Sequence, residues 1–397
     1  MANAYTGTGS STLGGTSGSA GLVQQAYDRL LEFALRSEPL IRSVADKTPA
    51  RQSIPGSTVV LQKYVDLEKN TTALTETTDP DSVALSTPTQ VSITLAEYGN
   101  SVLVTRALEL FSLADVDPAI ANIIAFNLAD SIDDVAMTTL RGGTNKLFGG
   151  TRTSTATLTA SDIIDSADIR KAVAKLRANK AIGRKGSLYW AGIHPEVSHD
   201  LRAESSSGQG WLLPNQYGSS QDRIWAGEIG NYEGAYYVES ARLYNAKTGA
   251  DQTALATASA VSGVSGAFTI VAANAAFGGR AEVGDKISGT NVGSSAKITA
   301  ISVGATNTTF TVDVANSGTV GTNTLTVTPV TRVFNTIVCG QQAMAQAVAE
   351  EPHVVIGPVV DKLMRHRPMG WYGVLGFARY REEALYRIET GSSIAAL

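Results

Sequence analysis

The chain has 397 residues, a net charge of −4 and one cysteine, and only 17% of its residues are charged. This length is enough for two or three domains, and the mild negative charge gives no basic footprint for sequence-specific nucleic-acid binding, although it leaves a local basic patch open. One cysteine excludes a disulfide framework within the chain, and we interpret Cys339 as a small buried apolar residue. The low charge, with plentiful Thr, Ala and Gly, favours β-rich structure whose surface is covered by partners.

The first hundred residues predict a tail, a helix and a long hairpin. Residues 1–20 are mostly Gly, Ser and Thr without charge, which is typical of a tail or of an arm ordered by a neighbour. Apolar residues at helical spacing predict a helix over 21–36. Apolar and polar residues then alternate over 59–67 and 91–95, which predicts two paired strands. The polar segment between them is unusually long for a loop in a compact domain, so we expect an arm that lies on another subunit.

The middle of the chain predicts helices around a buried strand. An Asp–Pro pair opens the longest helix, over 117–140, and a Gly–Gly pair stops it. A second helix is predicted over 161–179, with basic residues toward its end. A buried strand over 187–193, a short helix over 194–202 and a compact turn over 225–234 follow.

A change of composition near Tyr244 indicates an insertion. From about 247 to 329 the chain is rich in Thr, Ala, Ser, Gly, Val and Asn, and five or six short strands predict a small sandwich or barrel. The earlier composition resumes over 332–339, as expected of a domain inserted into a host domain. A helix over 341–349 and two closing strands, over 371–380 and 384–388, complete an α+β host.

The sequence offers no catalytic constellation. It contains no phosphate-binding loop, no dinucleotide fingerprint and no nucleophile elbow. His194 and His199 are five residues apart, which does not suit two metal ligands on one helical face. Three carboxylates of the long helix fit a solvated polar face or partners for an arginine; they are Asp130, Asp133 and Asp134.

Other charged groups also favour structural roles. Asp285 and Asp313 are too few oxygen ligands to predict calcium. Arg365 and Arg367 suit either a phosphate or an ion pair with the acidic arm of another subunit. We therefore expect no catalytic residue, no cofactor and no metal.

The order of these parts resembles the major capsid proteins of tailed bacteriophages, whose Hong Kong-type capsid fold is shared by encapsulin compartments. The resemblance covers roughly 21–245 and 331–390. It rests on the long hairpin, the capped long helix and four further stretches: Gly227–Gly234, Val238–Ser240, Asn335–Ala343, and Arg367–Gly373 followed by Phe377–Ala378 and Glu383–Glu389. The last of these stretches is the most specific.

The resemblance implies five segments. They are an N-terminal arm (1–55), an E-loop hairpin (56–104), the first part of the peripheral and axial domains (105–245), an inserted β domain (246–331) and the closing part (332–397). It implies a shell of hexamers and pentamers around DNA that is held without sequence-specific contact. Because no long charged helix precedes Gly21, it also implies a separate scaffolding protein, with a portal and a decoration protein as further partners.

We expect intersubunit contacts at nine residues of the arm and the closing strands: Lys63, Glu68, Lys69, Glu76, Asp79, Arg365, Arg367, Trp371 and Arg379. Lys63 and Lys69 are the lysines available for the crosslinks that some family members form. The start of the chain lacks a secretory signal and no apolar run reaches about 20 residues, so we expect a soluble protein made in a cytoplasm. The resemblance implies that it is part of a virion assembled in the cytoplasm of a bacterial host.

Three alternatives stay open at this point. An encapsulin-like shell would share the fold, although the insertion and the closing stretch favour a phage shell. A β-rich adhesin or tail component would explain the Thr/Gly tract but not the long helix. A hydrolase would need a site that the motifs do not provide.

Overall fold

The computed structural model describes residues 40–49, 57–67, 69–71, 73–74, 76–77, 82–106, 116–203, 228–255, 258–273, 281–358, 363 and 365–394. The predicted tail and the helix over 21–36 lie outside these residues. The chain divides into two compact units: one includes Asn100–Ala125 and Val354–Trp371, and the other includes Ser37–Gly99, Phe126–His353 and Tyr372–Leu397. Within the described residues, no helix is long and apolar enough to cross a membrane.

A seven-stranded sheet forms the centre of the larger unit. Its path is β5 (Lys146–Phe148), β19 (Leu385–Thr390), β16 (Val330–Cys339), β6 (Tyr189–Ile193), β8 (Ala235–Glu239) and β7 (Glu228–Tyr232), and β9 (Tyr244–Asp251) also pairs with β16. Residues of β6 are buried on both faces, because successive side chains point to opposite faces that are each covered.

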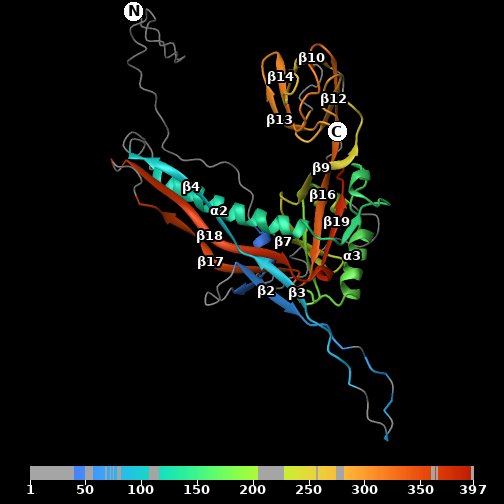
Figure 1. The fold of residues 1–397 in the computed structure, drawn as a ribbon. Coiled ribbons are helices and arrows are strands. Elements are labelled where there is room, and N and C mark those ends of the chain that lie inside the picture. The colour runs from blue at the N-terminus through green and yellow to red at the C-terminus, as the bar shows by residue number, and fades with distance from the viewer. Residues whose placement is uncertain are drawn as a thin grey trace, which may run out of the picture. The chain divides into compact units, whose positions relative to one another are not determined.

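Helices cover the two faces of this sheet. On one face, α3 (Ser166–Ala178) and α4 (Pro195–Ala203) pack against Tyr189, Ala191 and Val338. On the other, the C-terminal half of α2 (Val116–Arg141) and the short 3-10 helix η2 (Ile41–Val44) pack against Trp190, Ile337 and Cys339 (Figure 1). Cys339 is fully buried, and burial raises the pKa of its thiol to about 12.

A four-stranded sheet has the order β1 (Asp46–Pro49), β17 (Met344–Ile356), β18 (His366–Arg379) and β4 (Ala96–Thr105). The predicted helix over 341–349 is wrong, because this segment is the start of β17. Its Ala-rich sequence favours a helix locally, but parallel pairing with β1 and burial of Ala345 and Ala347 outweigh that weak preference.

Two other predicted boundaries are also wrong. The second helix begins at Ser166 and not at 161, because Asp165 caps it by accepting the Asp168 N–H at 2.8 Å. Asp162 instead accepts the N–H of Thr159 within the preceding turn. Within the predicted turn over 225–234, residues 228–232 form the strand β7 and Glu233 and Gly234 form a turn, while 225–227 lie outside the described residues.

The predicted hairpin is present as β2 (Thr58–Lys63) paired antiparallel with β3 (Thr89–Thr94). Ile93 anchors its base in a small core with Ala345 and Ala347. The described residues between the two strands form no further strand and extend away from them as a long loop (Figure 1). Residues 64–88, of which 64–67, 69–71, 73–74, 76–77 and 82–88 are described, are called the arm below.

Six strands between β9 and β16 form one sheet, in the order β12 (Lys286–Gly289), β15 (Thr324–Thr328), β10 (Ala258–Ser262), β11 (Thr269–Ala273), β14 (Asn307–Val312) and β13 (Ile298–Val303). The two edges meet, because Ile287 N–H donates to Ala296 O and Ile298 N–H donates to Asp285 O, each at 2.9 Å. The sheet therefore closes into a barrel, with its own core around Ile270, Ile287 and Phe310.

The connection to the host is a pair of strands. β9 runs past the expected boundary at 246 to Asp251, and it pairs antiparallel with β16, with Val330 opposite Asp251 and Phe334 opposite Tyr244. β9 and β16 thus lead from the seven-stranded sheet to the barrel (Figure 1). That the barrel is a separable inserted domain stays a prediction.

Candidate intersubunit surfaces

The arm exposes apolar side chains that its own chain does not cover. Six large apolar residues of the arm are between 55% and 78% exposed: Tyr64, Val65, Leu67, Leu74, Val83 and Leu85. Surfaces of this kind mark sites of association. Length and acidic charge alone predict the arm and do not reveal this feature, although its apolar residues are visible in the sequence.

The expected contact residues of the arm have different surroundings. Lys63, at the base, forms an ion pair with Glu383 of its own chain at 3.1 Å. The pKa of Glu383 is lowered by a hydrogen bond from its own backbone N–H and by Lys63. Lys69 and Glu76 are exposed. Glu68 and Asp79 lie outside the described residues, so the proposed acidic tip stays a prediction.

Arg365, Arg367 and Trp371 lie in the smaller unit, at and before the start of β18. Arg365 is exposed, and its carbonyl accepts the backbone N–H of Arg106 at 2.9 Å. Arg367 is half-buried. Trp371 is only 5% exposed, so most of its ring packs within its own chain and little remains to anchor a neighbour.

Arg379 has partners within its own chain. Its Nη1 donates to the Thr139 carbonyl at 3.0 Å, and its Nε donates to Glu382 at 2.9 Å. The Thr139 carbonyl belongs to the last turn of α2, where carbonyls lack helical partners and a cation is favourable. Gly142 admits this contact, since a Cβ there would collide with the guanidinium. Arg379 thus caps α2, and its expected intersubunit contact stays a prediction.

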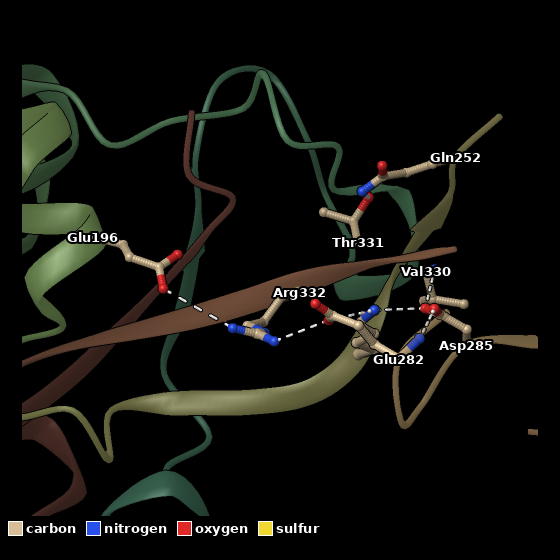
Figure 2. A network of polar contacts seen from close by, with 8 residues as sticks. Glu196, Gln252, Glu282, Asp285, Val330, Thr331 and Arg332 are labelled. Carbon is tan, nitrogen blue, oxygen red and sulfur yellow. Dashed lines mark hydrogen bonds and ion pairs between the residues drawn. The ribbon is translucent and has the colours of Figure 1, made fainter. Parts of the chain in front are cut away.

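A polar network fixes the junction between the barrel and the host (Figure 2). Lys247 of β9 donates to Asp285 at 2.6 Å and pairs with Glu282 at 2.9 Å. Asp285 is fully buried and also accepts the backbone N–H groups of Val330 and Glu282. Arg332 of β16 pairs with Glu282 at 3.2 Å.

The network continues to the host through Arg332, whose Nη1 lies 3.9 Å from Glu196 of α4. Hydrogen bonding from Lys247 lowers the pKa of Glu282, while burial raises that of Glu196. The sequence does not predict a calcium site at Asp285, and its partner in the structure is the buried Lys247 at 2.6 Å. Asp313 accepts the backbone N–H of Lys297. Among the described residues, no group of His, Cys, Asp and Glu could hold a metal ion.

The two histidines next to α4 also have separate environments. His194 is buried, with its ring centroid 4.8 Å from that of Phe334, and burial lowers its pKa to about 4. His199 is exposed, and its Nδ1 lies 3.5 Å from Asp200.

One predicted carboxylate of the polar face of α2 is in fact buried. Asp133 is fully buried and accepts the backbone N–H of Arg42 at 2.8 Å, with Arg242 3.5 Å away. Desolvation raises the pKa of Asp133. Asp130 is more exposed and pairs with Arg242. The two aspartates therefore tie α2 to η2 and to the turn after β8, within one chain.

Comparison with known proteins gives one family. The sequence profile described as "Phage capsid protein" matches residues 52–393. No curated protein shows a significant match to this chain.

Solved structures with this fold come from phage capsids. The capsid protein of Ralstonia phage GP4 is similar with a TM-score of 0.61 and 13% identity over 97% of this chain and 98% of that one. The capsid of cyanophage P-SCSP1u gives 0.57 and 12% over 96% of both chains. The cyanophage Pam1 capsid gives 0.55 and 11% over 97% of this chain and all of that one. With its α+β fold and a family match over most of its length, the chain belongs to the phage capsid protein family and is a structural major capsid protein.

Proposed function

We propose that this chain assembles with copies of itself into hexamers and pentamers, which close an icosahedral head around double-stranded DNA. The observation that carries the proposal is the arm, a long extended loop whose large apolar side chains are exposed in the single chain. Because these side chains are 55–78% exposed, covering each of them stabilises an interface by about 1–2 kcal/mol. A neighbouring copy that covers the arm supplies this gain at every contact of a repeating shell.

Electron microscopy of the purified full-length protein tests the proposal. We expect closed icosahedral particles, and discrete monomers or trimers under all assembly conditions would contradict it. A variant that lacks residues 70–86 is the matched control, because the hairpin base keeps its core contact through Ile93. This variant should fold but form fewer or weaker shells.

Further partners and the place of assembly form part of the same proposal. A separate scaffolding protein, a portal and a decoration protein rest on the resemblance to tailed-phage capsids, as does assembly in the cytoplasm of the bacterial host. Co-purification of assembly intermediates from infected cells would test them. We also propose that the chain catalyses no reaction, which agrees with the structural role of its family.

The inserted β domain is proposed as an accessory part of the head and not of its shell-forming core. The barrel has its own hydrophobic core and is joined through the paired strands β9 and β16. Replacement of 252–329 by a short Gly/Ser linker should therefore leave a soluble protein that still assembles. An insoluble, unfolded product would show that the barrel belongs to the core.

A further inference from the structure

The segment from α3 to the start of β6 carries the strongest local charge of the chain. Residues 166–185 contain seven basic residues and one acidic residue, a charge of +6, although the whole chain carries −4. The basic residues are Arg170, Lys171, Lys175, Arg177, Lys180, Arg184 and Lys185. A charge asymmetry of this size is the kind of electrostatic footprint that attracts polyanions.

Some of these cations are used within the fold. Lys171 forms an ion pair with Asp168 at 2.9 Å, and this hydrogen bond raises the pKa of Lys171. Arg184 donates to the Gly340 carbonyl at 3.2 Å and lies 3.4 Å from Asp46. Lys185 lies 5.6 Å from the centroid of the Tyr236 ring.

Lys175, Arg177 and Lys180 remain at the surface. All three are exposed, and within the part of the chain that the structure describes no carboxylate forms an ion pair with them. Arg177 and Arg170 lie along one flank of the exposed side of α3, and Lys175 lies along the other. Between the flanks lie the small exposed side chains of Ala174 and Ala178 and the exposed Lys171, whose amine is paired with Asp168.

Lys180 occupies a backbone position that favours glycine. The end of α3 is a Schellman motif, in which Ala181 N–H donates to Leu176 O at 3.0 Å and Lys180 N–H donates to Arg177 O at 2.9 Å. Lys180 is the left-handed residue of this motif, with φ of 57°. A lysine at this left-handed position makes the chain less stable than a glycine would, and residues of this kind concentrate at functional sites.

The chemistry of this surface fits phosphate better than protein. Interfaces between proteins have an apolar core and are depleted in lysine, whereas the apolar side chains beside the three cations here are exposed alanines and the half-buried Tyr386, whose ring centroid lies 6.0 Å from Lys175 Nζ. Phosphate backbones are bound by Lys and Arg side chains without an apolar contribution and without base contacts. We infer that Lys175, Arg177 and Lys180, on the exposed side and C-terminal end of α3, form the surface that contacts the phosphate backbone of duplex DNA. This inference rests on the proposed function, because it assigns the contact between the shell protein and the enclosed DNA.

Salt-dependent binding of a labelled 30-base-pair duplex of mixed sequence by the full-length protein tests the inference. The variant combines Lys175→Gln, Arg177→Gln and Lys180→Gln. Each lost phosphate contact should reduce the slope of log K against log salt by about 0.9, so the triple variant should lose about 2.7. The control combines Arg106→Gln, Arg202→Gln and Arg381→Gln, which remove the same charge at exposed sites elsewhere and should leave the slope unchanged.

Lys180→Gly separates DNA contact from helix capping. Glycine relieves the left-handed backbone, so thermal unfolding should shift to higher temperature while the salt slope falls by about 0.9. Equal slopes for the two triple variants would overturn the inference. So would stronger displacement by a polyglutamate peptide than by unlabelled duplex, since that result would assign the surface to an acidic protein.

Particle formation keeps the two proposals distinct. If the wild-type protein forms no shells, the proposed function fails. If wild-type and variant shells form equally well but the slopes are the same, only the DNA surface is wrong.

Discussion

The buried pair Lys247–Asp285 offers the sharpest test of how the barrel is held on the host. Lys247→Met keeps most of the volume of the lysine stem but removes its charge. Asp285 would then stay fully buried with two backbone N–H donors, from Val330 and Glu282, and without its cation. Glu282 would keep Arg332 as a partner at 3.2 Å. The main effect of the substitution is therefore an uncompensated carboxylate at Asp285.

The size of the effect follows from burial. Removal of one partner of a buried ion pair costs about 3–5 kcal/mol, because the remaining charge has lost its compensation. The neighbouring pair Lys286–Asp251 is the matched control, since its side chains are 36% and 48% exposed and water screens them. Lys286→Met should cost less than about 1 kcal/mol.

Hydrogen exchange of the full-length protein measures this difference locally. A loss of 3–5 kcal/mol corresponds to an exchange rate roughly 150 to 5,000 times faster for amides at the junction, such as Val330 N–H. Adding Asp285→Asn to Lys247→Met should recover part of the protection, because it removes the buried charge. If Lys247→Met and Lys286→Met accelerate exchange equally, or if the double variant is worse than the single one, the junction does not depend on a desolvated ion pair.

The remaining predictions concern pH, shell contacts and one helix end. His194 has a pKa of about 4 in the folded chain and 6.5 in the unfolded chain, so the unfolded state binds the extra proton as the pH drops. The free energy of unfolding should therefore fall by about 3 kcal/mol between pH 6.5 and pH 4. In chemical denaturation, His194→Gln should lack this part of the dependence of stability on pH, and an unchanged dependence would contradict the assignment. Deletion of 70–86 should weaken shells without lowering the unfolding temperature, as light scattering and calorimetry would measure, and normal shell stability would remove the arm from the interface. Arg365→Glu with Arg367→Glu should slow assembly, and changing the acids of the arm to Lys should restore it; no restoration means that these arginines have another partner. Lys180→Gly should stabilise the chain by about 1 kcal/mol, and a loss of stability in denaturation would show that Lys180 has a structural contact.

Most helices and strands could be predicted from sequence, because helix caps and the spacing of apolar residues act between residues close together in the chain. The Asp–Pro and Gly–Gly pairs placed α2 to within a residue at each end. Alternation of apolar residues located the hairpin, and the change of composition near Tyr244 located the barrel. The resemblance, which rests on the order of parts and the closing stretch, was confirmed by the family match.

Long-range pairing decided what the sequence could not. The segment after Gln341 has a helical composition, yet its pairing with β1 makes it the strand β17. The partners of Asp133, Asp285 and Arg379 come from segments far away in the chain, so nothing near these residues predicts them. Burial depends on the same packing, which is why Trp371 is covered by its own chain while the apolar residues of the arm are left exposed. Hydrophobicity fixes which residues need to be covered, and only the tertiary structure decides whether their own chain covers them.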